Sequence, residues 1–443
     1  MIMIRNNRLI IRGTKMLIRF KVGNFLSFNE IQEISMIAGA TKIHPSHIYS
    51  LDEVNLLKLA AIYGANASGK TNLIYAIRAA KEMISQGKIM DRRWYFRPDD
   101  KNKETPSFFE FEFEIDSIIY SYGFEVQISK QKIKSEWLYE LSSENKIIFQ
   151  RTEDNIAHEF DKKNDARLNV YIEDMKQSPN KLFLYDMSKK MRPDEEELSI
   201  FSKIYKWFKE RLLIIDSRTM DFNHHGNEAS DLLYRLGTGI TSSEYQLDKE
   251  AREIYPAGLL EDIHDSLIER KKAGITVGDI KSPEHRFSLS NDDEIIIEKL
   301  VFKHDSPQTC FTLSEESDGT VRLYSLLKIL LESEGDVTYI VDELDLRLHP
   351  QLTYKFIELF VERMKDNKNQ LIFTAHESYL IDFDLLRRDE IWFVNKECDA
   401  STIYSLEEFN ERSDRKLDKA YLEGRYGGVP IFSALFPIMK DRR

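Results

Sequence analysis

The stretch that decides the fold is LLKLAAIYGANASGKTNLIYAIRAAKEMI, at residues 56–84. It opens with a short apolar run, passes through a turn containing Gly64 and Gly69, and ends in a segment whose apolar residues recur three or four positions apart. This order predicts a buried strand, a loop and an amphipathic helix. The loop matches the full pattern G-x-x-x-x-G-K-T, which is specific when a strand precedes it and a helix follows it.

The chemistry of phosphate binding explains this spacing. Glycines let the backbone curl so that successive N–H groups point at phosphate oxygens, where the start of a helix favours an anion. The ammonium group of Lys70 is expected to reach the β- and γ-phosphates of ATP, and the Thr71 hydroxyl to bind Mg²⁺. The residues predicted to contact the nucleotide in this loop are Gly64, Asn66, Ala67, Ser68, Gly69, Lys70 and Thr71.

Two later segments supply the acidic and basic groups that such a loop requires. Asp342 and Glu343 follow the apolar run TYIV at 338–341, and ligands bind at the carboxyl ends of strands in parallel sheets. We expect Asp342 to hold Mg²⁺ through its water shell and Glu343 to activate the attacking water. His376 follows a second apolar run and is expected to contact the γ-phosphate.

The rest of the chain suggests three regions. Residues 16–150 contain the phosphate-binding loop and two stretches of alternating apolar and polar positions. The first runs from Met16 to Gly39 and predicts half-buried strands, and the second, at 106–150, predicts an antiparallel meander. Residues 151–285 carry longer polar amphipathic segments and are predicted to form a helical insertion. Helices alternate with continuous apolar strands in 286–443, which predicts a largely parallel sheet. Residues 1–15 are either an extra edge strand or an upstream extension.

Composition narrows the class of protein. The chain has 443 residues, 42% of them hydrophobic, which is enough for a substantial core. Its 63 Lys and Arg against 75 Asp and Glu give a formal net charge of −12, so any contact with DNA or RNA requires a local basic patch. Two cysteines, Cys310 and Cys398, cannot build a disulfide framework. No apolar run is long enough to span a bilayer, and we expect a cytoplasmic protein without membrane contact.

The order of motifs along the chain resembles one family. The motifs are the phosphate-binding loop, ESDGT at 316–320, DELD at 342–345, LHP at 348–350 and TAH at 374–376. They are similar to those of SMC-like ATP-binding-cassette (ABC) ATPases of bacterial anti-phage systems, of the RloA and AbiL type. The opening FKVGNFLSF at 20–28, EWLYE at 136–140 and the tail YLEGRYGGVP at 421–430 add to the resemblance, which covers nearly the whole chain from residue 16.

This resemblance implies an α/β fold, an ABC-type ATPase head with an antiparallel meander and a helical insertion. It implies that ATP and Mg²⁺ are bound, and that Ser317 and Gly319 cap the nucleotide of an opposing protomer, in a homodimer or a higher oligomer. The signature departs from the LSGGQ of the broader class, because Asp318 and Thr320 replace a Gly and a Gln.

The resemblance also implies that Asp345 lies in a segment that contacts the partner protomer. The broader class has a Gln lid over Mg²⁺. Gln127 and Gln131 are both candidates for it.

The function expected from the resemblance is a nucleotide-driven switch or sensor for a separate effector in anti-phage defence. That effector is expected to be nuclease-like and encoded nearby; contacts with a phage trigger protein, DNA or RNA stay open. One alternative is a self-sufficient DNA-processing enzyme or nuclease that cuts with His224 and His225 of the DFNHHG segment. Another is a structural scaffold that ATP binding assembles without hydrolysis.

Overall fold

The computed structural model describes most of the chain. The described residues are 15–51, 54–153, 155–159, 165–190, 199–215, 226–272, 280–281, 284–306, 308–331, 335–364, 368–409, 421 and 425–426. They fall into two compact units. Unit 1 comprises 1–215, 334–344 and 364–443, and unit 2 comprises 216–333 and 345–363.

The first sheet of unit 1 is a seven-stranded antiparallel sheet in the order β10-β9-β8-β7-β6-β1-β2. Its strands are β1 (Lys15–Gly23), β2 (Gln32–Ser35), β6 (Ser107–Ile115), β7 (Ile118–Gln127), β8 (Lys132–Leu141), β9 (Lys146–Thr152) and β10 (Ile156–His158). In β6, Phe109 and Phe111 are fully buried, whereas Glu110 faces the other side, where it pairs with Lys21. This alternation is the period of two that a half-buried strand requires, and it confirms the predicted antiparallel meander.

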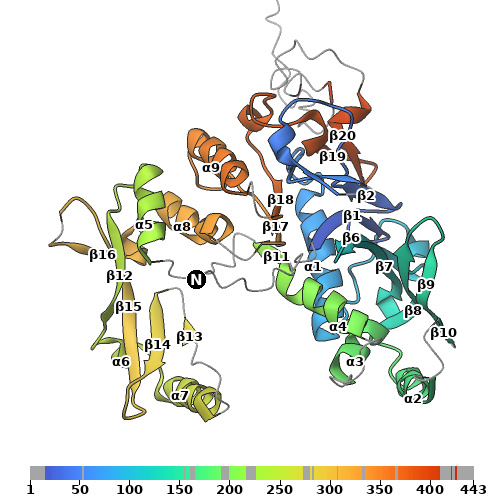
Figure 1. The fold of residues 1–443 in the computed structure, drawn as a ribbon, viewed down its shortest axis with the longest axis horizontal. Helices are drawn as coiled ribbons and strands as arrows, with labels where there is room; N and C mark the ends of the chain where they lie inside the picture. Colours follow the sequence, from blue (N-terminus) through green and yellow to red (C-terminus); the bar gives the residue numbers. More distant parts are fainter. Residues whose placement is uncertain are drawn as a thin grey trace, which may run out of the picture. The chain divides into compact units, whose positions relative to one another are not determined.

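The second sheet of unit 1 is six-stranded and largely parallel, in the order β11-β17-β18-β5-β19-β20, with only β20 antiparallel. Its paired strands β17 and β18 are labelled in Figure 1. Its strands are β5 (Leu59–Tyr63), β11 (Leu212–Ile215), β17 (Thr338–Val341), β18 (Gln370–Thr374), β19 (Ile391–Glu397) and β20 (Ala400–Ser405). All residues of β5, β17 and β18 are buried, as expected for strands covered on both faces.

Helices and a small hairpin complete unit 1. These elements are α1 (Lys70–Gln86), α2 (Asp165–Lys176), α3 (Phe183–Lys190), α4 (Ser199–Lys206), β3 (Ile48–Ser50) and β4 (Asn55–Leu57). The buried face of α1, which includes Ile74 and Ile77, belongs to one hydrophobic cluster with residues of both sheets. Helix α1 therefore links the two sheets through a shared core, with the phosphate-binding loop at its first turn.

Unit 2 contains both helices and a sheet. Its elements are α5 (Gly226–Arg235), β12 (Ser242–Leu247), α6 (Ala251–Ile254), α7 (Ala257–Lys272), β13 (Ile280–Lys281), β14 (His285–Leu289), β15 (Ile295–Lys303), β16 (Cys310–Thr312), α8 (Asp318–Leu331) and α9 (Pro350–Arg363). Strands β12, β15, β14 and β13 pair in that order, and β16 adds to β15. Ala251 and Leu267, from α6 and α7, pack with Phe287 and Ile297 of the sheet.

The segment 151–285, predicted to be a helical insertion, has a more mixed structure. It contains α2 to α7, but also strands, and it is divided between the two units after Ile215. Residues 207–211 form a π-helical turn. Strand β11 follows this turn directly and pairs in parallel with β17. None of the described helices is long and apolar enough to cross a bilayer.

Candidate nucleotide-binding site

The predicted phosphate-binding loop connects β5 to α1. Ala67 and Gly69 have positive φ angles, of 61° and 116°, so the loop curls back before Lys70 starts the helix. Neither Gly64 nor Gly69 has room for a side chain. A Cβ on Gly69 would lie 2.8 Å from Ser27 Oγ, and one on Gly64 would lie 2.6 Å from Ser68 Oγ.

Two serines far away in the sequence brace this loop. Ser401 of β20 donates a hydrogen bond to the Ser68 carbonyl (2.5 Å), and its Oγ accepts one from the Ser27 hydroxyl (2.8 Å). Ser27 Oγ also accepts a hydrogen bond from the Asn72 side chain (2.8 Å). Both serines are buried. The loop is therefore held by β20 and by the turn between β1 and β2, through residues that sequence analysis did not single out.

The polar side chains of the loop suit a phosphate. Lys70 is buried, and its ammonium group donates to the carbonyl oxygens of Gly64 (2.6 Å) and Ala65 (3.2 Å). Ser68 Oγ is buried without a hydrogen-bond partner among the described residues. A cation folded into the loop beside an unsatisfied hydroxyl matches the needs of an anion with several oxygens. The residues present therefore fit a nucleoside triphosphate.

The acidic pair, Asp342 and Glu343, follows the end of β17 and lies beside the phosphate-binding loop. Asp342 Oδ1 accepts a hydrogen bond from Thr374 Oγ1 (2.7 Å), and the Asp342 side chain is also hydrogen-bonded with Thr71. Burial raises the pKa of Asp342, while these hydrogen bonds and the charge of Lys70 act in the opposite direction. A buried carboxylate beside the Thr71 hydroxyl is a suitable oxygen donor set for Mg²⁺.

Glu343 and His376 lie together at the same edge. Glu343 adopts a left-handed backbone conformation, with φ 53°, and its N–H donates to Thr374 Oγ1 (2.7 Å). Its side chain is about one-third exposed, and Oε1 lies 3.4 Å from His376 Nε2. Thr374 thus orients both acidic residues, because its hydroxyl donates to Asp342 and accepts from Glu343.

The predicted signature begins α8 in unit 2. Ser317 caps this helix, since its Oγ accepts a hydrogen bond from the Thr320 N–H (3.1 Å). The Asp318 carboxylate lies 3.4 Å from the Arg347 guanidinium, and a Cβ on Gly319 would lie 3.0 Å from the Arg347 carbonyl. The segment after the acidic pair therefore packs against the start of the signature helix.

A side-chain hydrogen bond also fixes the segment just before the signature. His304 Nε2 lies 2.7 Å from Glu316 Oε1, which ties the end of β15 to the residue preceding Ser317. Asp345, expected near a partner protomer, is buried, and its carbonyl accepts the Leu348 N–H (3.1 Å). Sequence analysis did not single out His304 or Arg347.

The remaining predicted residues lie elsewhere. The Gln127 amide donates to Glu104, and the Gln131 amide donates to the carbonyls of Met90 and Ile128. Neither contact favours one glutamine as the lid. His224 and His225 lie outside the described residues. Among the described residues, no group of three or more His, Cys, Asp or Glu side chains could hold a metal ion.

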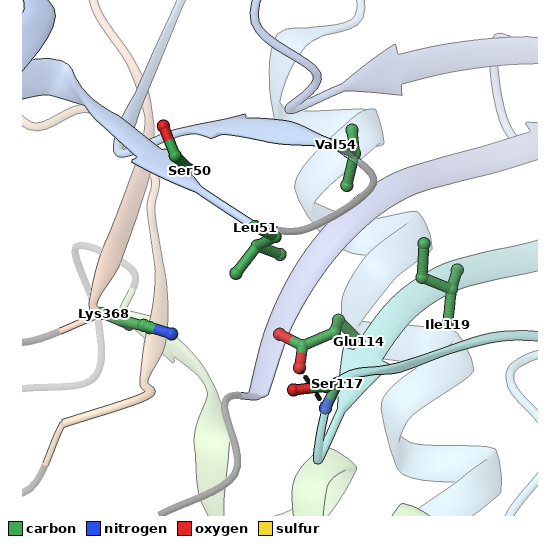
Figure 2. A pocket seen from close by; sticks show the side chains of 7 residues that line it. All are labelled: Ser50, Leu51, Val54, Glu114, Ser117, Ile119 and Lys368. Atoms are coloured by element: carbon green, nitrogen blue, oxygen red, sulfur yellow. Dashed lines mark hydrogen bonds between the residues drawn. The ribbon is translucent and has the colours of Figure 1, made fainter. Parts of the chain in front are cut away.

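A separate cavity of about 160 Å³ lies in unit 1 (Figure 2). It is lined by Ser50, Leu51, Val54, Glu114, Ser117, Ile119 and Lys368. Lys368 precedes β18, whereas His376 follows this strand. The cavity is therefore at the amino end of the parallel strands, away from the acidic pair and the phosphate-binding loop.

A phosphate-binding loop between a parallel strand and a helix, with an acidic strand end bonded to it, defines the class of P-loop proteins. Residues 59–382 match the family model described as "AAA domain, putative AbiEii toxin, Type IV TA system". This match covers more than half of the sequence, and the chain belongs to this AAA domain family. No curated protein matches the chain significantly.

Solved structures of SMC heads are similar in part. A head bound to the C-terminal winged-helix domain of ScpA aligns at 14% identity and a TM-score of 0.43, over 88% of this chain and 98% of that chain. The SMC head domain from Thermotoga maritima aligns at 13% identity and a TM-score of 0.34, over 88% of this chain and 98% of that chain. A Pyrococcus furiosus SMC head with an extended coiled coil, bound to the C-terminal domain of ScpA, aligns at 14% identity and a TM-score of 0.37. This alignment covers 93% of this chain and 100% of that chain.

Proposed function

We propose that this protein is an ATPase that converts ATP and water to ADP and phosphate with Mg²⁺. One observation carries the proposal: the side chain of Asp342 is hydrogen-bonded with Thr71, so the acidic strand end and the phosphate-binding loop form a single site. Residues more than 270 positions apart would have no reason to meet here in a loop that was only a glycine-rich turn.

Each residue of the site has a separate role in binding or hydrolysing ATP. Lys70 and the loop N–H groups bind the β- and γ-phosphates, and Thr71 with Asp342 holds Mg²⁺, directly or through water. When bound, the metal neutralises charge that develops on the phosphate oxygens. Glu343 accepts the proton of the attacking water, and His376, 3.4 Å from that carboxylate, contacts the γ-phosphate.

Ser317 and Gly319 complete the site of an opposing protomer. Both belong to unit 2, whereas the phosphate-binding loop and the acidic pair belong to unit 1. The cap at Ser317 leaves the first N–H groups of α8 available for a phosphate oxygen. ATP therefore joins two heads into a homodimer, or a higher oligomer, and hydrolysis releases them.

The cycle serves as a switch or sensor for a separate effector in bacterial anti-phage defence. The motif resemblance supports this role, and the family description refers to a toxin–antitoxin system. The effector is a separate, nuclease-like protein encoded nearby, and the switch acts in the cytoplasm. Contact with a phage trigger protein or with DNA or RNA would determine whether the switch activates or restrains the effector.

Glu343→Gln tests the catalytic part of this proposal. We expect turnover to fall at least about 100-fold, because general-base catalysis contributes on this scale, while ATP binding remains. ATP should then trap a dimer, measured by light scattering after size-exclusion chromatography. Glu377→Gln, an exposed carboxylate beside His376, is the matched control and should hydrolyse ATP normally. Wild-type turnover in Glu343→Gln would refute the assignment.

Co-elution tests the effector part. Wild type and Lys70→Ala are purified with and without the product of the neighbouring gene, with and without ATP. A complex whose amount depends on ATP in the wild type alone supports a switch. DNA cleavage by the solitary chain would instead support the self-sufficient enzyme, and equal assembly with and without ATP would refute a nucleotide-driven switch.

A further inference from the structure

The tail motif at 421–430 has no role in the site described so far. Three of its residues are described: Tyr421 and Tyr426 are buried in unit 1, and Arg425 is exposed. The rings of the two tyrosines stack on Phe393 of β19, with centroids 5.5 and 5.6 Å away and interplanar angles of 19° and 14°. The two tyrosines are thus held by the same aromatic residue.

The strand that carries Phe393 also touches the phosphate-binding loop. A Cβ on Gly64 would clash with the carbonyl oxygen of Val394, the next residue in β19. The Tyr63 ring, immediately before the loop, lies 6.4 Å from Phe393 and 6.2 Å from Tyr421. The aromatic cluster therefore packs directly behind the first glycine of the loop.

The Tyr421 hydroxyl makes a specific contact there. It is hydrogen-bonded with the backbone of Gly64, and burial raises the pKa of Tyr421 to about 12, so the phenol stays neutral. The Gly64 carbonyl in turn accepts the Lys70 ammonium at 2.6 Å. One residue of the loop therefore bonds with both the tail and the lysine predicted to bind phosphate.

We propose that Tyr421 is a positioning residue of the nucleotide site, acting through Gly64 to hold the phosphate-binding loop in its binding geometry. This inference rests on the proposed function. Gly64 lacks a side chain and cannot be anchored by packing of its own, so a hydrogen bond to its backbone restricts the loop directly. The tail motif is thereby part of the site rather than an independent appendage.

The tail offers a matched pair of substitutions. Tyr421→Phe removes the hydroxyl at Gly64 and keeps the ring on Phe393. Tyr426→Phe removes a hydroxyl from the same cluster, while the contact to Tyr404 uses the Tyr426 backbone carbonyl (2.5 Å) and is retained. Both variants preserve the stacked rings, so both should fold and should melt at similar temperatures without nucleotide.

The experiment measures ATP affinity by displacement of a fluorescent ATP analogue, together with KM and kcat of the full chain. Tyr421→Phe should weaken ATP binding and raise KM by about two- to tenfold, the range allowed for one lost hydrogen bond, with a smaller change in kcat. Tyr426→Phe should match the wild type. Equal affinity in Tyr421→Phe and wild type would overturn the inference, as would an equal loss in both variants.

The two proposals fail differently. If the wild type does not bind ATP, the proposed function is wrong. If the wild type binds and hydrolyses ATP but Tyr421→Phe is unchanged, only the role of Tyr421 is wrong.

Discussion

The phosphate-binding loop in unit 1 and the signature in unit 2 are built in opposite ways. Gly64, Ser68, Gly69 and Lys70 of the loop are buried. Neutral hydrogen bonds brace it, from Ser401 to the Ser68 carbonyl and between Ser401 and Ser27. The start of the signature helix is more open, and the side chains of its Asp318–Arg347 ion pair are 76% and 50% exposed. The difference shows that the geometry of the loop is preformed within unit 1, whereas Ser317 and Asp318 at the start of α8 are exposed.

The largest effect should come from the preformed side. Lys70→Ala removes the buried cation, and we expect ATP affinity to fall at least roughly 30-fold, because a lost charge-assisted contact costs about 2 kcal/mol or more. Turnover should become undetectable. Lys81→Ala, on the same helix, is the control and should bind ATP normally. Binding is measured by calorimetry; unchanged affinity in Lys70→Ala would remove the loop from the site.

A substitution in the signature should separate binding from pairing. Ser317→Arg places a bulky side chain where a second protomer would approach, so turnover should fall about 100-fold, as for loss of one transition-state donor. ATP affinity of the single chain should not change. Ser314→Arg, three residues earlier, is the control. Loss of ATP binding in Ser317→Arg would show that the two regions are not independent.

Asp342→Asn should raise the thermal stability of the protein at neutral pH. The folded-state pKa of Asp342 lies above its ordinary value because of burial, so ionisation at pH 7 costs folding free energy. The variant should therefore melt about 1–3 °C higher at pH 7, and this advantage should shrink as the pH falls towards the ordinary value of 3.8. Differential scanning calorimetry checks it; a lower melting temperature at pH 7 would contradict the expectation.

The smallest effect should come from the exposed ion pair. Arg347→Ala should change the free energy of unfolding by less than about 1 kcal/mol, because exposed pairs contribute little. Arg347→Lys serves as the charge-preserving control in the same urea titration. A loss of several kcal/mol would mean that the signature is as rigidly built as the loop.

The sequence predicted what is local and missed what is not. The loop and its flanking strand and helix are contiguous, so their pattern alone identified them. Ser401 could not be found, because nothing local indicates that β20 begins beside Ser68. Strand β11 was read as part of a helical region, since a four-residue apolar run carries no distinguishing period. Its pairing with β17 decides the structure there.

The acidic pair shows a middle case. Its position after an apolar strand made Asp342 and Glu343 candidates, but the role of Thr374 depends on the parallel pairing of β17 with β18. Such pairing depends on the whole sheet and is not encoded in either segment alone. The expected contact of Ser317 with a partner nucleotide remains a prediction.

One buried side chain joins the two sheets of unit 1. Gln370, at the start of β18, bonds with both the N–H and the carbonyl of Leu17 in β1, and also with the Leu57 carbonyl and the Thr338 hydroxyl. All of its donors and acceptors serve this junction. In evolutionary terms, the two sheets form one inherited block. Recombination that exchanged either sheet alone would leave these buried polar groups without hydrogen-bond partners, so the sheets should have diverged together.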